Sequence, residues 1–307
     1  MVMAYRSSPF SRFTLDDRAL PRIGYGLGRL ARHVRSEHER QSAVALLRHA
    51  FDLGVRHFDT AQFYGDGLAN SLLRDAFVTQ QSPVFIATKV GARPPTSSPA
   101  PEAAQHPRQL REAVEANLTS LGVDHLDLVY LRRMDYAPGV IAASDQIVDL
   151  DDQLSELVRL RDTGHIRAIG LSHVTCAQLT SSLSADIAGV QNIYNVLERS
   201  SQPLLDLCER HQIAWTPYFP LGGGGYANLP RVMDDPTVRT VAERLGRTPQ
   251  QIGLAWQLAN SPNTLLIPGT ADPKHLRENV DVGAIVLDSE LMAELNSVTF
   301  TTSTLPV

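Results

Sequence analysis

Short apolar runs alternate with longer segments of helical periodicity between about residue 20 and residue 285. Runs without polar alternation suit strands buried on both faces, as in a parallel sheet covered by helices. Eight such runs predict eight strands, at Arg22–Tyr25, Val55–Phe58, Val84–Thr88, Leu126–Leu131, Ile166–Leu171, Ala188–Asn192, Ile213–Pro217 and Thr264–Ile267.

The segments between these runs carry signals for the start and end of helices. A glycine follows four of the helical segments, at Gly54, Gly122, Gly164 and Gly246. Glycine is preferred directly after a helix because it readily adopts the left-handed backbone conformation. An Asp or Thr followed by proline, at the N-cap and first helical positions, opens three helices. The predicted helices are Ala43–Leu53, Pro107–Leu121, Asp151–Thr163 and those beginning at Pro236, Pro249 and Pro273.

Eight strands alternating with helices predict a parallel α/β sheet. Eight such units in about 265 residues favour a closed (β/α)8 TIM barrel over an open doubly wound sheet. We find no internal repeat and no linker that would divide the chain. Residues 1–307 are therefore predicted to form a single (β/α)8 barrel domain.

Composition narrows the class of protein. The net charge of −5 argues against a nucleic-acid or anionic-membrane surface, and no apolar run is long enough to span a membrane. The segment Met1–Ser8 lacks the apolar region of a secretory signal. Cys176 and Cys208 have neither metal nor redox spacing, and no two histidines have the spacing of metal ligands. We expect a cytoplasmic protein without a metal, and the oligomeric state stays open.

Two loops that follow predicted strands stand out. Gly91–His106 is rich in Pro, Ser and Ala, and Gly222–Gly225 is a run of glycines. Loops after the strands lie on the catalytic face of a barrel, so both are candidate lids over a ligand. The alternative for the first loop is a disordered surface insertion. The glycine run suits a close approach of backbone to ligand.

Asp59, Tyr64 and Lys89 follow or end the second and third predicted strands, so all three are expected in the mouth of the barrel. A carbonyl reductase needs an acid that protonates the developing alkoxide. An adjacent ammonium lowers the pKa of a tyrosine from its ordinary value of about 10, and a carboxylate holds the lysine. The alternative is a structural Asp–Lys pair with a tyrosine nearby. His57, one layer deeper on the same face, is predicted to be packed and hydrogen-bonded.

Lysine is rare in this chain. Of 28 basic residues only Lys89 and Lys274 are lysines. Lysine is compact and its pKa can shift, whereas arginine is a planar fork that stays charged. A lysine in a chain that otherwise uses arginine suggests that its position requires an ammonium group. The alternative is that the two lysines are present by chance.

Six ordered segments resemble motifs of the aldo-keto reductase family, and the resemblance covers roughly residues 20–298. They are Phe58–Gly65, Ala87–Val90, Gly170–His173, Val190–Asn195, Pro217–Leu221, and Ile267–Thr270 with Glu278–Asn279. The resemblance implies reduction of an aldehyde or ketone to an alcohol with NADPH. It makes Asp59, Tyr64 and Lys89 the catalytic core.

The same resemblance implies a nicotinamide site. Ser172 and Gln191 would bind the carboxamide, with His173 where the family usually has Asn, and Tyr218 would stack on the ring. The helix start at Asp272–Pro273 independently suits the 2′-phosphate of NADPH. The implied cofactor-binding residues are Gly26, Ser172, His173, Gln191, Tyr218, Leu221, Gly223, Gly225, Thr270, Lys274, Glu278 and Asn279.

Arg132 departs from the family pattern, which usually has histidine at the end of the fourth strand. A bacterial branch that includes pyridoxal reductases is similar in having arginine here, which makes pyridoxal the leading named substrate. Arg132 is predicted to be catalytic, because a guanidinium donates hydrogen bonds to a substrate oxygen without giving up its proton. The alternative is that Arg132 turns outward and pairs with Asp135 or Glu198.

Two other functions stay open at this stage. A nicotinamide-binding regulatory or redox-sensing barrel would have weak or no turnover. A barrel lyase that uses Lys89 as a Schiff base would leave the motifs around Tyr64 and Gln191 unexplained.

Overall fold

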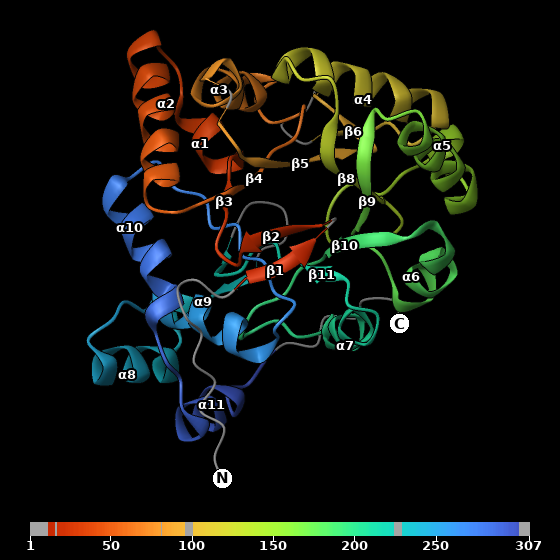
Figure 1. Ribbon diagram of the computed structural model, residues 1–307. Coiled ribbons are helices and arrows are strands. Elements are labelled where there is room, and N and C mark those ends of the chain that lie inside the picture. Colours follow the sequence, from red (N-terminus) through yellow and green to blue (C-terminus); the bar gives the residue numbers. More distant parts are fainter. Residues whose placement is uncertain (1–11, 16, 81, 96–100, 224–228, 301–307) are drawn as a thin grey trace.

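The structure is a computed structural model that describes residues 12–15, 17–80, 82–95, 101–223 and 229–300. A curled parallel sheet forms its centre, with helices around the outside, which confirms the predicted (β/α)8 barrel (Figure 1). Assignment of all 307 residues to one domain stays a prediction. Seven strands pair in the order β11-β10-β9-β8-β5-β4-β3: Ala214–Trp215, Ile187–Gln191, Ile166–Ser172, Leu126–Arg132, Phe85–Val90, His57–Asp59 and Tyr25–Gly26.

The eighth predicted strand closes the barrel with less pairing than the other seven. Thr264 bridges Trp215 of β11, and Leu266 bridges Ile23, which lies just before β3. The prediction of a regular strand over Thr264–Ile267 is therefore wrong, although the segment does occupy the eighth position. It is only four residues long and ends at a proline, which has no N–H to donate to a neighbouring strand.

Arg22 holds this closing segment in place. Its buried guanidinium donates to the carbonyl oxygens of Thr264 at 3.0 Å and Leu258 at 2.9 Å, and also to that of Ser261. Two of these carbonyls lie at the end of helix α9 (Pro249–Asn260), where the helix dipole is negative. Burial lowers the pKa of Arg22 to about 10, so the group stays charged at neutral pH. A buried cation thus joins the two ends of the barrel sheet.

The helices follow the capping signals closely. The observed helices are α1 Gly28–His33, α2 Glu37–Asp52, α3 Leu68–Ala76, α4 Pro107–Leu121, α5 Leu150–Asp162, α6 Cys176–Ser182, α7 Gln202–Arg210, α8 Pro236–Leu245, α9, α10 Pro273–Asp281 and α11 Ser289–Asn296. Helix α4 has the predicted bounds, and Gly122 and Gly246 end their helices in the left-handed conformation. Across the described ranges, no helix has the length and apolar character of a membrane span.

Helix α2 begins six residues before the predicted start at Ala43. Ser36 caps it by accepting a hydrogen bond from the Glu39 amide at 3.3 Å. The added turns are polar and solvent-exposed, so the hydrophobic periodicity does not reveal them.

A β-hairpin that the sequence pattern did not predict, β1 (Arg12–Leu15) and β2 (Arg18–Pro21), covers one end of the barrel. Arg18 donates to the Val84 carbonyl and pairs with Asp127, and both of these residues lie where barrel strands begin. Leu15 and Leu20 pack on side chains that fill the barrel interior, which are Phe85, Ala87, Leu128, Tyr130, Ala168, Ala214 and Leu265. The opposite end, where the strands finish, is left as the mouth.

Tyr130 of β8 fills the middle of the barrel because the next two strands of the sheet, β9 and β10, carry glycines that face its side chain. A Cβ added at Gly170 or Gly189 would lie 2.4 or 2.9 Å from the tyrosine side chain. The buried hydroxyl of Tyr130 lies 3.2 Å from Thr216 Oγ1. The largely apolar barrel interior thus contains a paired hydroxyl at Tyr130.

Two short antiparallel ladders form in the loops singled out from the sequence, one in Gly91–His106 and one that begins in the glycine run at Gly222. β6 (Ala92–Arg93) pairs with β7 (Glu102–Ala103), and β12 (Gly222–Gly223) pairs with β13 (Leu229–Arg231). At both loops the described residues are structured by strand pairing and not by helix.

The role of Arg22 gives a stability prediction. We expect Arg22→Met to lower the free energy of unfolding by roughly 2–4 kcal/mol, because the buried carbonyls of Leu258, Ser261 and Thr264 would lose their donor. Urea unfolding followed by circular dichroism measures the change. Arg108→Met, whose parent side chain is 81% exposed, is the control and should shift stability by less than about 0.5 kcal/mol. Equal effects for the two variants would contradict a closing role for Arg22.

Candidate active site

A buried ion pair lies at the mouth of the barrel. Asp59 ends β4 and Lys89 lies one residue before the end of β5, on adjacent parallel strands. The Lys89 ammonium lies 2.5 Å from Asp59 Oδ1 and donates to the Thr60 carbonyl at 3.0 Å. Only 2% of Asp59 and 7% of Lys89 is exposed.

The environment favours the charged form of Lys89. Burial alone would lower its pKa, but the charge of Asp59 and the hydrogen bonds of Asp59 and Tyr64 raise the pKa above its ordinary value. Asp59 Oδ2, the other oxygen of the carboxylate, accepts a hydrogen bond from Gln191 Nε2 at 2.7 Å. The carboxylate is thus held from both sides, which offsets part of the cost of burying it.

Tyr64 lies in the loop after β4, and a hydrogen bond with its side chain is one cause of the raised pKa of Lys89. The Lys89 ammonium also lies 5.0 Å from the centre of the tyrosine ring. Gly28, at the start of α1, faces the ring on another side, because an added Cβ would lie 3.3 Å from its Cζ and Cε2 atoms. The structure therefore brings Asp59, Tyr64 and Lys89 together.

His57 lies beneath this group and is fully buried against Phe85, with ring centres 5.6 Å apart. Burial lowers its pKa to about 4. Neither ring nitrogen has a hydrogen-bond partner in the part of the chain that the structure describes. His57 is packed as predicted, but the expectation that it is hydrogen-bonded is wrong, since apolar side chains and backbone surround it.

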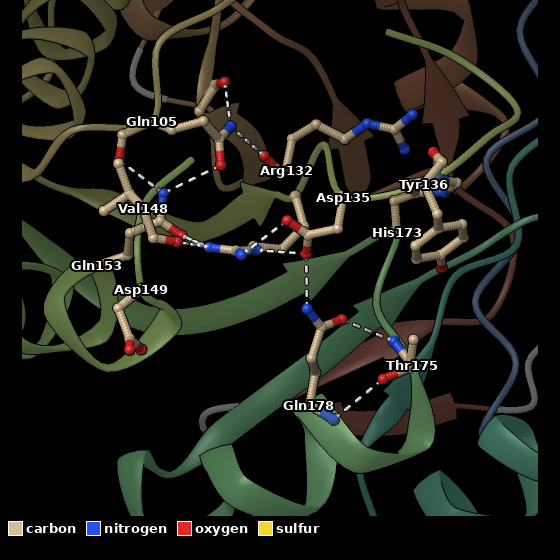
Figure 2. A network of polar contacts seen from close by, with 12 residues as sticks. Gln105, Arg132, Asp135, Tyr136, Val148, Asp149, Gln153, His173, Thr175 and Gln178 are labelled. Atoms are coloured by element: carbon tan, nitrogen blue, oxygen red, sulfur yellow. Dashed lines mark hydrogen bonds and ion pairs between the residues drawn. The ribbon is translucent and has the colours of Figure 1, made fainter. Parts of the chain in front are cut away.

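Arg132 ends β8 and turns into the mouth. Its Nη1 donates to the Tyr218 hydroxyl at 3.1 Å and lies 3.5 Å from Ser172 Oγ. In Figure 2 its side chain extends away from Asp135. Asp135 forms its ion pair with Arg133 at 2.8 Å, and the Glu198 carboxylate accepts a hydrogen bond from the Ser200 amide at 3.1 Å. Arg132 turns toward Tyr218 and Ser172 instead of outward.

A buried glutamine pair supports the backbone of Arg132 (Figure 2). Gln105 Nε2 donates to the carbonyls of Gly91 at 2.6 Å and Arg132 at 2.9 Å. Gln153 of α5 donates to the Gln105 carbonyl at 2.6 Å. Gln105 therefore ties the two ends of the loop after β5 to each other and to the end of β8. The sequence offered no signal for these glutamines, because their partners are distant in the chain.

Ser172 and Gln191 end β9 and β10 and are paired in register. Gln191 Oε1 is buried and has no hydrogen-bond partner within the described ranges. An unsatisfied buried acceptor is costly, so this oxygen fits a ligand that brings N–H donors, as a nicotinamide carboxamide does.

His173 and Tyr218 lie beside Ser172. The two His173 ring nitrogens contact the Tyr218 hydroxyl at 2.7 Å and the Tyr136 carbonyl at 2.9 Å. Tyr218 is half-buried and lies between His173 and Arg132. The structure thus places a histidine, a tyrosine and an arginine in one connected group.

The residues expected around the adenosine end cluster at α10. Asp272 caps the helix by accepting from the Lys274 amide at 2.7 Å. The exposed Lys274 ammonium lies 3.6 Å from the Glu278 carboxylate one turn later, and Asn279 follows. Buried Thr270 accepts a hydrogen bond from the Asp272 amide at 3.0 Å.

Close backbone contacts shape the rest of the predicted cofactor site. A Cβ added at Gly26 would lie 2.6 Å from the Ile267 carbonyl oxygen. Leu221 precedes β12 and packs on the hydrophobic core, and Gly223 lies in β12 with a left-handed φ of 65°. Gly225 lies outside the described residues.

Comparison with known proteins agrees with this geometry. Residues 22–299 match the Aldo/keto reductase family. Pyridoxine 4-dehydrogenase from Escherichia coli K12 is 37% identical over 301 residues, covering 93% of this chain and 97% of that protein. An uncharacterized oxidoreductase from Schizosaccharomyces pombe is 32% identical, covering 92% and 88%. A crystal structure of an aldo/keto reductase from Klebsiella pneumoniae in complex with NADP and acetate matches with a TM-score of 0.77 at 25% identity, covering 93% and 94%. The chain therefore belongs to the aldo/keto reductase family of oxidoreductases.

Proposed function

We propose that this enzyme uses NADPH to reduce an aldehyde or ketone to an alcohol, with pyridoxal the leading substrate. The observation that carries the proposal is the buried Asp59–Lys89 pair, with the Lys89 ammonium 5.0 Å from the centre of the Tyr64 ring. The E. coli relative named pyridoxine 4-dehydrogenase supports the choice of substrate, since the aldehyde that corresponds to pyridoxine at position 4 is pyridoxal. Within this proposal the enzyme acts in the cytoplasm.

Tyr64 is the proton donor in this proposal. Transfer of its proton to the carbonyl oxygen leaves a tyrosinate, which the adjacent Lys89 ammonium stabilises. Asp59 keeps that ammonium in position from below. Such an acid typically contributes a factor of about 10² to 10⁴ in rate.

Arg132 holds the substrate oxygen in this proposal. Its guanidinium stays protonated near neutral pH, so it donates hydrogen bonds and a fixed positive charge but no proton. Pyridoxal carries a phenolic oxygen next to its aldehyde group. A guanidinium at the mouth can bind that anionic oxygen while Tyr64 serves the carbonyl.

NADPH supplies the hydride when it is bound. The orphaned Gln191 Oε1 and the neighbouring Ser172 fit the carboxamide, and Tyr218 offers a ring to the nicotinamide. The NADP complex of the Klebsiella relative supports this choice of cofactor. The other residues that we expect to hold the cofactor are Gly26, Leu221, Gly223, Gly225, Thr270, Lys274, Glu278 and Asn279.

The proton-donor role predicts the effect of Tyr64→Phe. This change removes only the hydroxyl, so kcat should fall by about 10² to 10⁴ while the Kd for NADPH changes less than about twofold. Steady-state kinetics and fluorescence titration give the two values. A variant that keeps most of its turnover would remove Tyr64 from the mechanism.

The position of Lys274 predicts cofactor preference. A charged hydrogen bond to the 2′-phosphate is worth about 1.5–3 kcal/mol, so Lys274→Met should weaken NADPH binding by roughly ten- to a hundredfold. NADH lacks the phosphate and serves as the internal control, with an unchanged Kd. If wild type bound both cofactors equally, Lys274 would have no part in recognising the phosphate.

The position of Arg132 predicts substrate discrimination. Arg132→Ala should lower kcat/KM for pyridoxal roughly ten- to a hundredfold, and it should lower kcat/KM for pyridine-4-carbaldehyde much less, because that aldehyde lacks the phenolic oxygen. Arg132→Lys keeps the positive charge but not the planar guanidinium with its several N–H donors, and should retain part of the activity that Arg132→Ala loses. Wild-type kcat/KM in Arg132→Ala would show that this arginine has no role in the reaction.

A further inference from the structure

His173 occupies an unusual backbone position beside the candidate active site. It follows β9 with φ of 62°, in the left-handed region that asparagine and histidine enter more readily than most side chains. The residue is 2% exposed, and its ring stacks on the Tyr136 ring, with centres 4.0 Å apart and planes 23° apart (Figure 2). The imidazole is therefore held in one orientation.

The two hydrogen bonds of the ring determine which nitrogen carries the proton. The Tyr136 carbonyl, 2.9 Å from Nε2, can only accept, so Nε2 must carry a hydrogen. Burial and the charge of Arg132 lower the pKa of His173 to about 3, which leaves the ring neutral with a single N–H. Nδ1 is therefore an acceptor, and the Tyr218 hydroxyl at 2.7 Å must donate to it.

This assignment also fixes the contact between Tyr218 and Arg132. The single proton of the Tyr218 hydroxyl points to His173, so its oxygen presents a lone pair to Arg132 Nη1 at 3.1 Å. Donation therefore runs in one direction, from Arg132 to Tyr218, then to His173, then to the Tyr136 carbonyl. The shorter side chain of asparagine could not reach both Tyr136 and Tyr218.

We infer that His173 is a positioning residue that aims Arg132 at the substrate through the Tyr218 hydroxyl. Both of its ring nitrogens are engaged with protein atoms, which leaves the carboxamide to Ser172 and Gln191. The inference rests on the proposed function, in which Arg132 binds a substrate oxygen. It assigns to His173 a different role from that of a cofactor ligand.

A double-mutant cycle tests this coupling. His173→Gly removes the ring without straining the left-handed backbone, and Tyr218→Phe removes only the linking hydroxyl. Each change should lower kcat/KM for pyridoxal about three- to tenfold, and His173→Gly should cause little further loss in the Tyr218→Phe background. His173→Asn can supply an acceptor near the position of Nδ1 and should recover part of the activity.

Two further readouts separate positioning from a purely structural or cofactor-binding role. Because the effect acts through Arg132, His173→Gly should lower the preference for pyridoxal over pyridine-4-carbaldehyde and leave the Kd for NADPH unchanged. Tyr194→Phe removes a buried tyrosine hydroxyl that donates to Gln202 of α7 and accepts from Asn260 at the end of α9, and should have wild-type kinetics. A full His173→Gly effect in the Tyr218→Phe background, or a raised Kd for NADPH, would overturn the inference.

The tautomer of His173 can be measured without turnover. Nitrogen-15 NMR of the histidine-labelled protein, assigned by loss of the signal in His173→Asn, should show Nε2 protonated and Nδ1 unprotonated from pH 5 to pH 8. An Nδ1–H tautomer or an imidazolium would overturn the inference even in an active enzyme. The expected tautomer in a protein that reduces no aldehyde would instead contradict the proposed function alone.

Discussion

The ion pair of Asp59 and Lys89 is the interaction on which the candidate active site depends. Two charges buried at the ends of adjacent strands are costly, and removing one partner alone typically destabilises a protein by about 3–5 kcal/mol. The barrel offsets that cost with the Thr60 carbonyl and the Gln191 amide. The same contacts fix where Lys89 and Tyr64 lie. The stability of the fold and the proposed proton transfer therefore depend on the same side chains.

The charges at the mouth suit a reaction that develops negative charge. Asp59 neutralises Lys89, whereas Arg132 faces hydroxyl groups and a neutral histidine. Two cationic side chains, Lys89 and Arg132, thus reach the mouth, where we propose that the substrate oxygen binds. Neutrality of His173 matters here, because a second cation beside Arg132 would repel it and remove the acceptor for Tyr218.

Local sequence signals predicted the barrel, helix α4 and the strand ends that carry Asp59 and Lys89, because capping and apolar runs are local properties. The hairpin β1–β2 escaped prediction, since its strands are short and their outer positions are polar. Long-range contacts were also missed. Gln105 meets Arg132 through tertiary structure alone, and the partners of His173 come from loops distant in the chain.

The central claim is that the Lys89 ammonium prepares the Tyr64 hydroxyl to donate its proton, and the ionisation of Tyr64 tests this most directly. Ultraviolet titration of wild type against Tyr64→Phe isolates the tyrosinate absorbance of this one residue. The account predicts a midpoint below the value of about 10 for a free tyrosine. It predicts a higher midpoint when Asp59→Asn and Lys89→Met together remove both charges of the pair, a change that avoids leaving a lone buried charge. An identical midpoint with and without the ion pair would contradict the account.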